Sequence, residues 1–201
     1  MRGWNQSASS RQLEGVERVS DEDDWRRAVA GDGDAFASIF DRHTGAVRRQ
    51  AWRLSASRSD VEDVVAIVFL EAWRRRQAVR LVDGTVLPWL LVTTVYVCNN
   101  LRRSRLRHET LLQRLPAPST APDPADLIDE GDLLAALRRL KRSDQQVLTL
   151  CVLEEMTERD AAVVLAIPPG TVKSRLHRAK RRLSEQFRLS PESRSEVRHG
   201  L

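Results

Sequence analysis

The most informative chemistry lies in a basic segment near the end of the chain. Six of the ten residues at positions 173–182 are Lys or Arg, and none is acidic. Long cationic side chains along a helix can anchor phosphates, and their donors can reach base edges in the major groove, where each good pair discriminates by about 1–3 kcal/mol. The segment therefore predicts nucleic-acid binding. The alternative is a solvated basic helix face.

The residues before and within this segment have the pattern of a helix-turn-helix unit. We expect a short helix over 157–165, a tight connection over 166–170 and a longer helix beginning at 169–171. The second helix of such a unit enters the major groove of duplex DNA. Apolar residues recur in it at i, i+4, i+7 and i+11, and this spacing predicts a buried stripe of Val172, Leu176, Ala179 and Leu183.

A second basic cluster, NNLRRSRLRH at 99–108, ends another predicted helix. Four of the seven residues at 101–107 are Arg. Each arginine that neutralises a phosphate makes binding more salt-sensitive, and the amide of Asn100 can pair with a base edge. A solvated helix end that favours cations is the alternative. The number of arginines favours contact with nucleic acid.

The segment DVEDVVAIVFLEAWRRR at 60–76 predicts a helix with two different faces. One face is apolar, and the other mixes apolar residues with charged ones, as a surface for a partner protein does. An ordinary amphipathic core helix is the alternative. The inward set is Val61, Val65, Val68, Phe69, Ala72 and Trp73, and the other face carries Asp60, Asp63, Ile67, Leu70, Glu71 and Arg74.

No pattern in the chain indicates catalysis or metal binding. The four histidines do not suggest a cluster, and Asp60, Glu62 and Asp63 are explained by helix capping. Cys98 and Cys151 lack the C-x-x-C spacing of zinc or redox sites, and no Gly-Lys-Ser/Thr phosphate loop is present. We therefore expect no enzymatic activity, cofactor, metal or small-molecule substrate. An enzyme acting on nucleic acid is the alternative class.

Composition agrees with a nucleic-acid partner. The chain of 201 residues is 41% hydrophobic and 30% charged, with a formal net charge of +5. A basic balance favours an anionic partner. The N-terminus has no apolar segment of the kind found in a secretory signal, and the longest apolar stretches, such as 64–70, are too short to span a membrane. We expect a cytoplasmic protein with no membrane contact.

The elements that position these motifs predict an all-α fold of two small helical domains joined by an acidic Pro-rich linker. Helix starts are expected at Ser20, near Asp34, at a capping box over 59–62 and near Pro88. Residues 116–130 hold four prolines, four acids and no basic residue, which is typical of an extended linker. The expected organisation is a disordered tail at 1–19, a first domain at 20–108, a linker at 109–131, a helix-turn-helix domain at 132–189 and a tail at 190–201.

The sequence GTVKSRLHRAK at 170–180 resembles the recognition helix in region 4 of bacterial sigma factors, particularly the extracytoplasmic-function (ECF) group. The resemblance implies binding to the promoter −35 element. The chain departs from the family at Ala166, where Gly is usual, and at Pro168, where a capping Ser is usual; a left-handed Ala166 would cost about 1 kcal/mol. By motif position, Lys173, Ser174, His177 and Arg178 would face bases, while Thr171 and Arg175 would hold the DNA backbone.

The sequence EDVVAIVFLEAW at 62–73 resembles sigma region 2.2, which docks on core RNA polymerase. The family commonly has Gln-Glu where this chain has Ala66 and Ile67, so one carboxylate is missing. Carried over by position, the implied polymerase contacts are Asp63, Ile67, Leu70 and Arg74.

Residues 99–108 resemble sigma regions 2.3–2.4, which read the −10 element as separated strands. In the family the loop before this helix, here about 80–87, traps a flipped base, whose lost stacking the protein must replace. Val86 stands where the family often has Phe, so aromatic stacking is missing there, and Tyr96 either faces DNA or packs in the core. The implied −10 contacts are Val86, Tyr96, Asn100, Arg102, Arg103 and Arg105.

Taken together, the resemblance implies a sigma factor that binds core RNA polymerase, directs it to promoters through −10 and −35 contacts and promotes strand opening without nucleotide hydrolysis. The implied partners are bacterial core RNA polymerase, promoter DNA and, as a family expectation, an anti-sigma factor. The acidic linker would thread the basic cleft of the polymerase. The alternative is a stand-alone helix-turn-helix regulator that binds duplex DNA.

Overall fold

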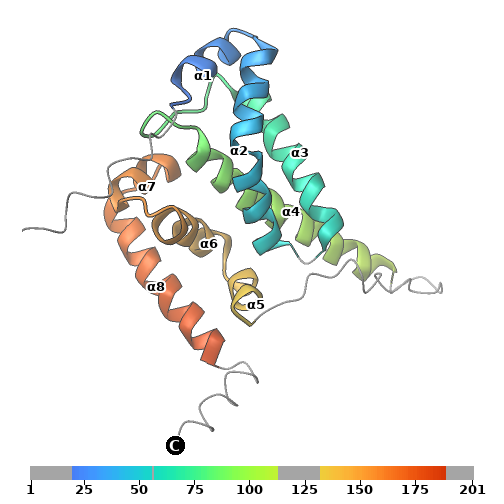
Figure 1. Ribbon diagram of the computed structural model, residues 1–201. Coiled ribbons are helices and arrows are strands. Elements are labelled where there is room, and N and C mark those ends of the chain that lie inside the picture. Colours follow the sequence, from blue (N-terminus) through green and yellow to red (C-terminus); the bar gives the residue numbers. More distant parts are fainter. Residues whose placement is uncertain (1–19, 56, 113–131, 189–201) are drawn as a thin grey trace, which may run out of the picture.

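The computed structural model describes residues 20–55, 57–112 and 132–188, which are helical with short connections (Figure 1). The all-α prediction is confirmed for these residues. The predicted tails at 1–19 and 190–201, and residues 113–131 of the predicted linker, lie outside them. The first group of helices is α1 (Glu22–Val29), α2 (Gly33–Leu54), α3 (Arg58–Arg75) and α4 (Leu87–Leu112). The second group is α5 (Asp132–Arg139), α6 (Arg142–Leu148), the π-helix η2 (Thr149–Leu153), α7 (Glu158–Leu165) and α8 (Pro169–Arg188).

The first group forms a bundle in which α2 packs against α1, α3 and α4. Helix α2 begins at the Asp32 cap, whose carboxylate accepts hydrogen bonds from the amides of Asp34 and Ala35. The predicted inward face of α3 packs into the bundle, with Trp73 only partly buried. Burial of these aliphatic side chains supplies the main driving force for the bundle. The core includes Ile39 and Val47 of α2, Val64 and Val68 of α3, and Leu90 and Val95 of α4.

The second group has a smaller core, in which α6, α7 and α8 meet. The predicted stripe of α8 is confirmed, because Val172 and Ala179 are fully buried while Leu176 and Leu183 pack against the same core. Helix α7 begins as predicted at the Thr157 cap, whose hydroxyl accepts a hydrogen bond from the amide of Asp160.

Two predicted helix boundaries were wrong. Helix α3 begins at Arg58 with Ser57 as its cap residue, so the expected capping box at 59–62 lies inside the first turn. Asp60 is buried there and pairs with Arg105 of α4, so a tertiary ion pair replaces the expected local role. Helix α4 begins at Leu87 and continues to Leu112, past the helix end expected near 108.

The turn between α7 and α8 has the strained geometry expected at Ala166. Its φ and ψ of 51° and 46° are left-handed. The amide of Ile167 donates to the carbonyl of Ala162 at 3.1 Å, and the Ala166 amide donates to that of Val163 at 3.3 Å. These bonds close the helix end in the way that usually employs glycine. The chain therefore carries a backbone cost at the centre of its helix-turn-helix unit.

Replacement of Ala166 by Gly is expected to raise the free energy of unfolding by about 0.5–1 kcal/mol, because glycine has no Cβ penalty at positive φ. Urea denaturation measures the change. Ala66→Gly, at an exposed position within α3, is the matched control and should lower the free energy of unfolding by about 1 kcal/mol. A destabilised Ala166→Gly variant would contradict the strain at this turn.

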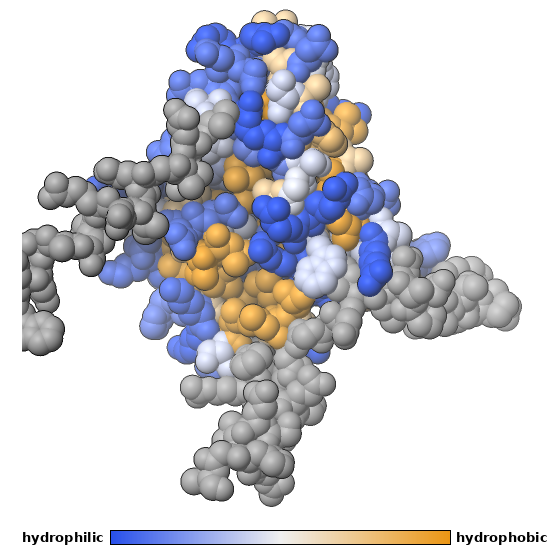
Figure 2. All heavy atoms as spheres, in the orientation of Figure 1, coloured by the Kyte–Doolittle hydropathy of each residue, from blue (hydrophilic) through white to orange (hydrophobic). Residues whose placement is uncertain are grey.

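The two groups of helices lie against each other. Helix α5 contacts α2, and α6 and η2 contact α4 (Figure 1). Figure 2 shows hydrophobic side chains gathered on the lower part of this face, where α5, α6 and α8 lie, below a more hydrophilic region. None of the described helices has the length and apolar character needed to cross a membrane.

Candidate nucleic-acid interface

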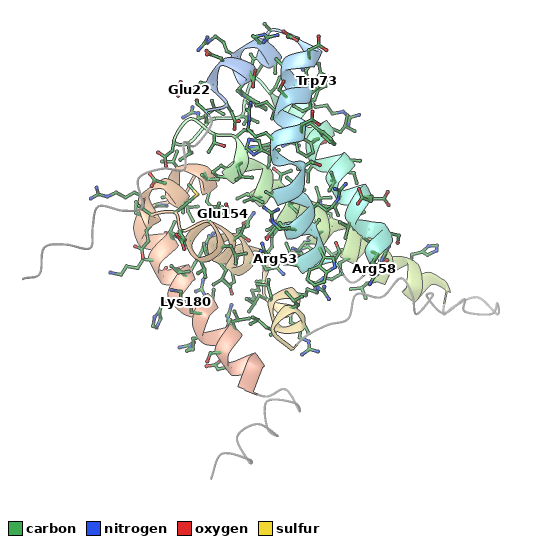
Figure 3. The ribbon with its side chains drawn as sticks, in the orientation of Figure 1. Glu22, Arg53, Arg58, Trp73, Glu154 and Lys180 are labelled. Atoms are coloured by element: carbon green, nitrogen blue, oxygen red, sulfur yellow. The ribbon has the colours of Figure 1, made fainter. Side chains whose placement is uncertain are left out.

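Helix α8 presents a row of polar side chains to solvent on the side away from its buried stripe. Lys173, Ser174 and His177 are exposed, as is Lys180 further along the helix (Figure 3). Thr171, Arg175 and Arg178 are half-buried. The six residues predicted for −35 binding thus lie on one helix, with three of them fully available to a ligand.

An ion pair anchors α8 to the helix beside it. Asp144 at the start of α6 is fully buried, and its Oδ2 accepts a hydrogen bond from Nη1 of Arg182 at 2.6 Å. A buried carboxylate needs such a partner because the free-energy cost of removing its charge from water is otherwise not offset. Arg182 is therefore held by α6, although the sequence placed it in the basic DNA-binding segment.

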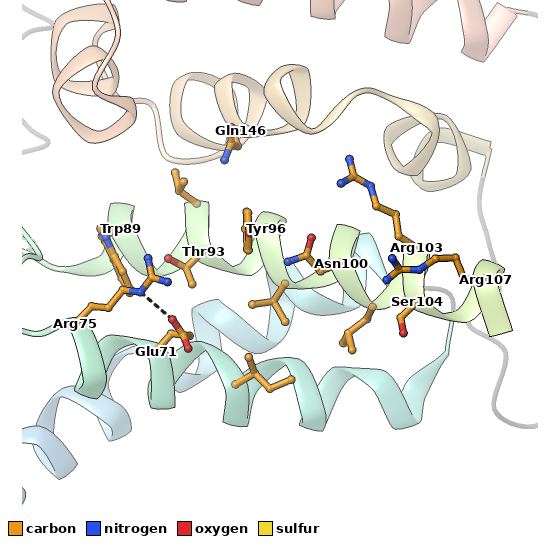
Figure 4. A pocket seen from close by; sticks show the side chains of 14 residues that line it. Glu71, Arg75, Trp89, Thr93, Tyr96, Asn100, Arg103, Ser104, Arg107 and Gln146 are labelled. Carbon is orange, nitrogen blue, oxygen red and sulfur yellow. Dashed lines mark ion pairs between the residues drawn. The ribbon is translucent and has the colours of Figure 1, made fainter.

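A polar groove runs along α4 where this helix faces α3 and α6. Tyr96, Asn100 and Arg103 point from α4 toward the second group of helices, and Gln146 points back from α6 (Figure 4). The groove has a volume of about 830 Å³ and is open to solvent. Arginine, amide and aromatic side chains in one groove can bind phosphates, base edges and unstacked bases. The groove also contains Glu71 and Arg75 of α3, which pair with each other.

The structure separates the remaining residues of the predicted −10 set. Val86 is fully buried and packs in the first core, so its placement does not favour a contact between its side chain and a base. Arg105 is paired with Asp60, and Nη1 of Arg102 donates to the carbonyl of Arg138 at 2.7 Å. Tyr96, Asn100 and Arg103 are thus the part of the predicted set that the groove brings together.

The connection before α4 is held by Asp21, which directly follows the helix start expected at Ser20. Its buried carboxylate accepts hydrogen bonds from the Thr85 hydroxyl and the Val86 amide, each at 2.8 Å, and lies 2.8 Å from Nε2 of His43. Arg42 also donates to it. Burial acts to raise the pKa of this carboxyl, but the bonds from His43, Val86, Thr85 and Arg42 outweigh it and hold the pKa well below its ordinary value.

A signal for this network was present in the sequence. His43 lies on the buried stripe of α2, between Ile39 and Val47. A polar side chain on an otherwise apolar stripe needs a buried hydrogen-bond partner. The pattern shows that His43 has a partner, but the partner, Asp21, lies on another element and can be identified only from the fold.

The residues predicted to contact polymerase lie along one outer side of α3. Asp63, Leu70 and Arg74 are exposed, and Ile67 is partly buried between this side and the groove of α4. Their spacing of four, three and four residues places them on a single face of a helix. Leu70 is 45% exposed, which is unusual for a large aliphatic side chain and is consistent with a docking surface.

Within the described residues, no group of three or more His, Cys, Asp or Glu side chains is placed to hold a metal ion. Cys98 and Cys151 are free thiols. Burial raises the pKa of the Cys98 thiol to about 12, so it is a thiol and not a thiolate near neutral pH.

Comparison with known families matches both groups of helices. Residues 39–108 match the family model described as Sigma-70 region 2, and residues 130–183 match the one described as Sigma-70, region 4. The first match contains α3 and most of α4, and the second contains the helix-turn-helix unit. The two regions occur in the order that the motifs predicted.

Relatives with known names agree with these matches. The chain is 30% identical over 192 residues to the ECF RNA polymerase sigma factor BldN of Streptomyces coelicolor, covering 92% of this chain and 68% of that protein. It is 30% identical over 169 residues to the ECF RNA polymerase sigma factor SigE of Mycolicibacterium smegmatis, covering 78% of this chain and 64% of that protein.

A solved structure shares the fold. The sigma factor RpoE of Bartonella quintana, crystallised with the anti-sigma factor NepR, matches with a TM-score of 0.55 at 24% identity, over 77% of this chain and 98% of that one. This likeness concerns the fold alone. The two family models and the extent of the identity to BldN show that the chain belongs to the ECF family of RNA polymerase sigma factors.

Proposed function

We propose that the chain binds core RNA polymerase and directs it to promoters, with the first group of helices at the −10 element and α8 at the −35 element. The observation that supports this most is the presence, on one chain, of an exposed basic face on α8 and a separate polar groove on α4. One surface suits duplex DNA and the other suits a separated strand.

At the −35 element, Lys173, Ser174 and His177 would contact base edges, because their side chains leave the exposed face of α8 near its N-terminus. Thr171 and Arg175 would hold phosphates. Arg178 is half-buried, so we place it at the edge of this contact. The helix N-terminus adds a partial positive charge beside the DNA backbone.

At the −10 element, the groove of α4 would hold the separated strand. Tyr96 can stack on a base, Asn100 can pair with a base edge and Arg103 can neutralise a phosphate. Asp21 would shape the preceding loop through Thr85 and the Val86 amide, so that the loop meets DNA through its backbone while the Val86 side chain stays buried.

The side of α3 that carries Asp63, Ile67, Leu70 and Arg74 would dock on core polymerase. We propose that the chain has no catalytic site and acts in the cytoplasm, where its polymerase partner is found. Because the related RpoE is bound by the anti-sigma factor NepR, we also propose an anti-sigma partner for this chain. A stand-alone helix-turn-helix regulator is disfavoured, since it would have no use for the region 2 match.

Transcription in vitro with core polymerase tests this proposal. Lys173→Ala is expected to lower transcription from a promoter with both elements by about 10-fold, the loss of one base or phosphate contact. Asn100→Ala should lower transcription from duplex promoters. Its effect should be smaller on a template whose strands are already separated at −10, because the protein then does not have to open the duplex. Arg26→Ala, an exposed charge change on α1, is the control. Equal activity of all three variants, or no transcription by the parent chain, would refute the proposal.

A further inference from the structure

The groove along α4 has two chemically different ends. The exposed arginines Arg103 and Arg107 lie at one end, and at the other Glu71 and Arg75 of α3 lie beside Trp89 (Figure 4). Trp89 and Arg103 are about 20 Å apart along the helix axis, since each residue of an α-helix adds about 1.5 Å. The arginines suit the phosphates of a strand. A carboxylate repels phosphates, so the Glu71 end suits a different part of the strand.

The carboxylate of Glu71 keeps the capacity to accept a further hydrogen bond. Its Oε2 lies 2.9 Å from Nε of Arg75, but its Oε1 lies 3.8 Å from Nη1 of Arg74, which is too long for a hydrogen bond. The Glu71 side chain is 28% exposed, whereas that of Arg75 is 68% exposed. Exposed ion pairs of this kind are weak. Arg75 can therefore turn to a phosphate at little cost, while Glu71 stays in the groove.

A carboxylate in a groove for single strands can distinguish bases by their amino groups. Carboxylates only accept hydrogen bonds, and cytosine, adenine and guanine each have an amino group that donates one. The Watson–Crick edge of thymine has a single N–H between two carbonyl oxygens, and these oxygens repel a carboxylate. Trp89 lines the same end of the groove and is partly buried against the first core, so its ring is held where it can stack on an unpaired base.

We propose that Glu71 is a specificity-determining residue: it accepts a hydrogen bond from the amino group of an unstacked base and so disfavours thymine at the Trp89 end of the groove. This inference rests on the proposed role of the groove in holding the −10 strand. The phosphates of the strand would then follow α4 toward Arg103 and Arg107. If Glu71 serves only to pair with Arg75 on the surface of α3, the groove has no preference of this kind.

Two single-stranded probes isolate the amino group. Fluorescein-labelled 12-mers of deoxycytidine and of deoxyuridine have the same charge and ring size, but only cytosine has the amino group, and uracil has the Watson–Crick edge of thymine without its methyl group. Fluorescence anisotropy on the full chain without polymerase, at slightly alkaline pH, measures the two affinities. We expect the parent chain to bind the cytosine oligomer about tenfold more tightly than the uracil oligomer, the effect of one good contact to a base.

Glu71→Gln tests whether this preference comes from the carboxylate. The glutamine amide both donates and accepts, so it can pair with either base, and the ratio of the two affinities should fall to about one. Loss of the negative charge by itself strengthens binding to both oligomers by the same factor and leaves the ratio unchanged. Glu62→Gln makes the same change at an exposed residue of α3 that pairs with Arg48, and it should keep the tenfold ratio of the parent chain.

The ratio of affinities decides the proposal. Equal affinity of the parent chain for the two oligomers overturns it, as does a Glu71→Gln variant that keeps the parent ratio or a Glu62→Gln variant that loses it. These results are separate from those that test the proposed function, because promoter-directed transcription depends on polymerase and base discrimination by the free chain does not. Discrimination without transcription would support the role of Glu71 and refute the sigma role, and transcription without discrimination would do the reverse.

Discussion

Replacement of Asp21 by Ala is expected to lower the free energy of unfolding by about 3–5 kcal/mol, the cost of breaking a buried ion pair by removing one partner. The carboxylate is fully buried and serves His43, Arg42, Thr85 and the Val86 amide at once. Its removal leaves the His43 and Thr85 side chains and the buried Val86 amide without this acceptor, while Arg42 keeps its bond to Asp24. Urea denaturation followed by circular dichroism measures the loss.

The pH dependence gives a second test of the Asp21 network. The pKa of the Asp21 carboxyl is lower in the folded chain than in the unfolded chain. Its contribution to the free energy of unfolding is therefore fully present above the unfolded-state pKa of about 4 and is lost as the pH falls below that value. The stability difference between the parent chain and Asp21→Asn should therefore be constant near neutral pH and should narrow below about pH 4. Asp23→Asn, at an exposed position in α1, is the control and should cost little at any pH. Equal costs for Asp21→Asn and Asp23→Asn would contradict the network.

Replacement of Leu70 by Glu is expected to weaken binding to core RNA polymerase by about 2–4 kcal/mol, or roughly 30- to 1000-fold. Leu70 is 45% exposed and lies at the centre of the side of α3 that we propose to dock on polymerase. If this side docks on polymerase, the variant places an unpaired carboxylate in the contact, which costs more than the loss of the leucine methyl groups. Competition with a labelled sigma factor for core polymerase measures the affinity.

The matched control for Leu70→Glu is Leu133→Glu on α5, which makes the same change at another exposed leucine, in the second group. Both substitutions are at the surface, so the free energy of unfolding should change by less than about 0.5 kcal/mol. Loss of polymerase binding in Leu70→Glu alone locates the contact on α3. Unchanged polymerase binding by Leu70→Glu would refute the proposal that this side of α3 docks on polymerase.

Local rules of helix formation predicted much of the second group. The apolar spacing of α8 and the start of α7 at Thr157 follow from residues within a few positions of each other, and both are present in the structure. The left-handed Ala166, also present, was expected from the resemblance, because the family usually has Gly there. The basic face of α8 could be assigned for the same reason, since a buried stripe leaves the remaining residues of a helix outside.

Local rules failed where a residue interacts with a distant element. Ser59 and Glu62 have the spacing of a capping box, but Asp60 pairs with Arg105 of α4, and α3 begins earlier at Arg58. The side chain of Val86, which the resemblance placed at the −10 contact, is buried in the core, and its amide donates to Asp21. Asp60 and Val86 thus both contact residues that lie far away along the chain.

The sequence by itself determined that the chain is helical, that it carries two sigma-like motifs in order, and which face of each amphipathic helix is buried. The structure shows His43 and Gln50 on the buried stripe of α2, a placement that was not among the predictions. Only the tertiary structure showed that their partners are Asp21 and Thr149, and that Arg138 caps α2 from the other group of helices. The periodicity of apolar residues indicates which side chains of a helix are buried, because burial repeats with each turn. It does not indicate their partners, because residues far apart in sequence are brought together only by tertiary packing.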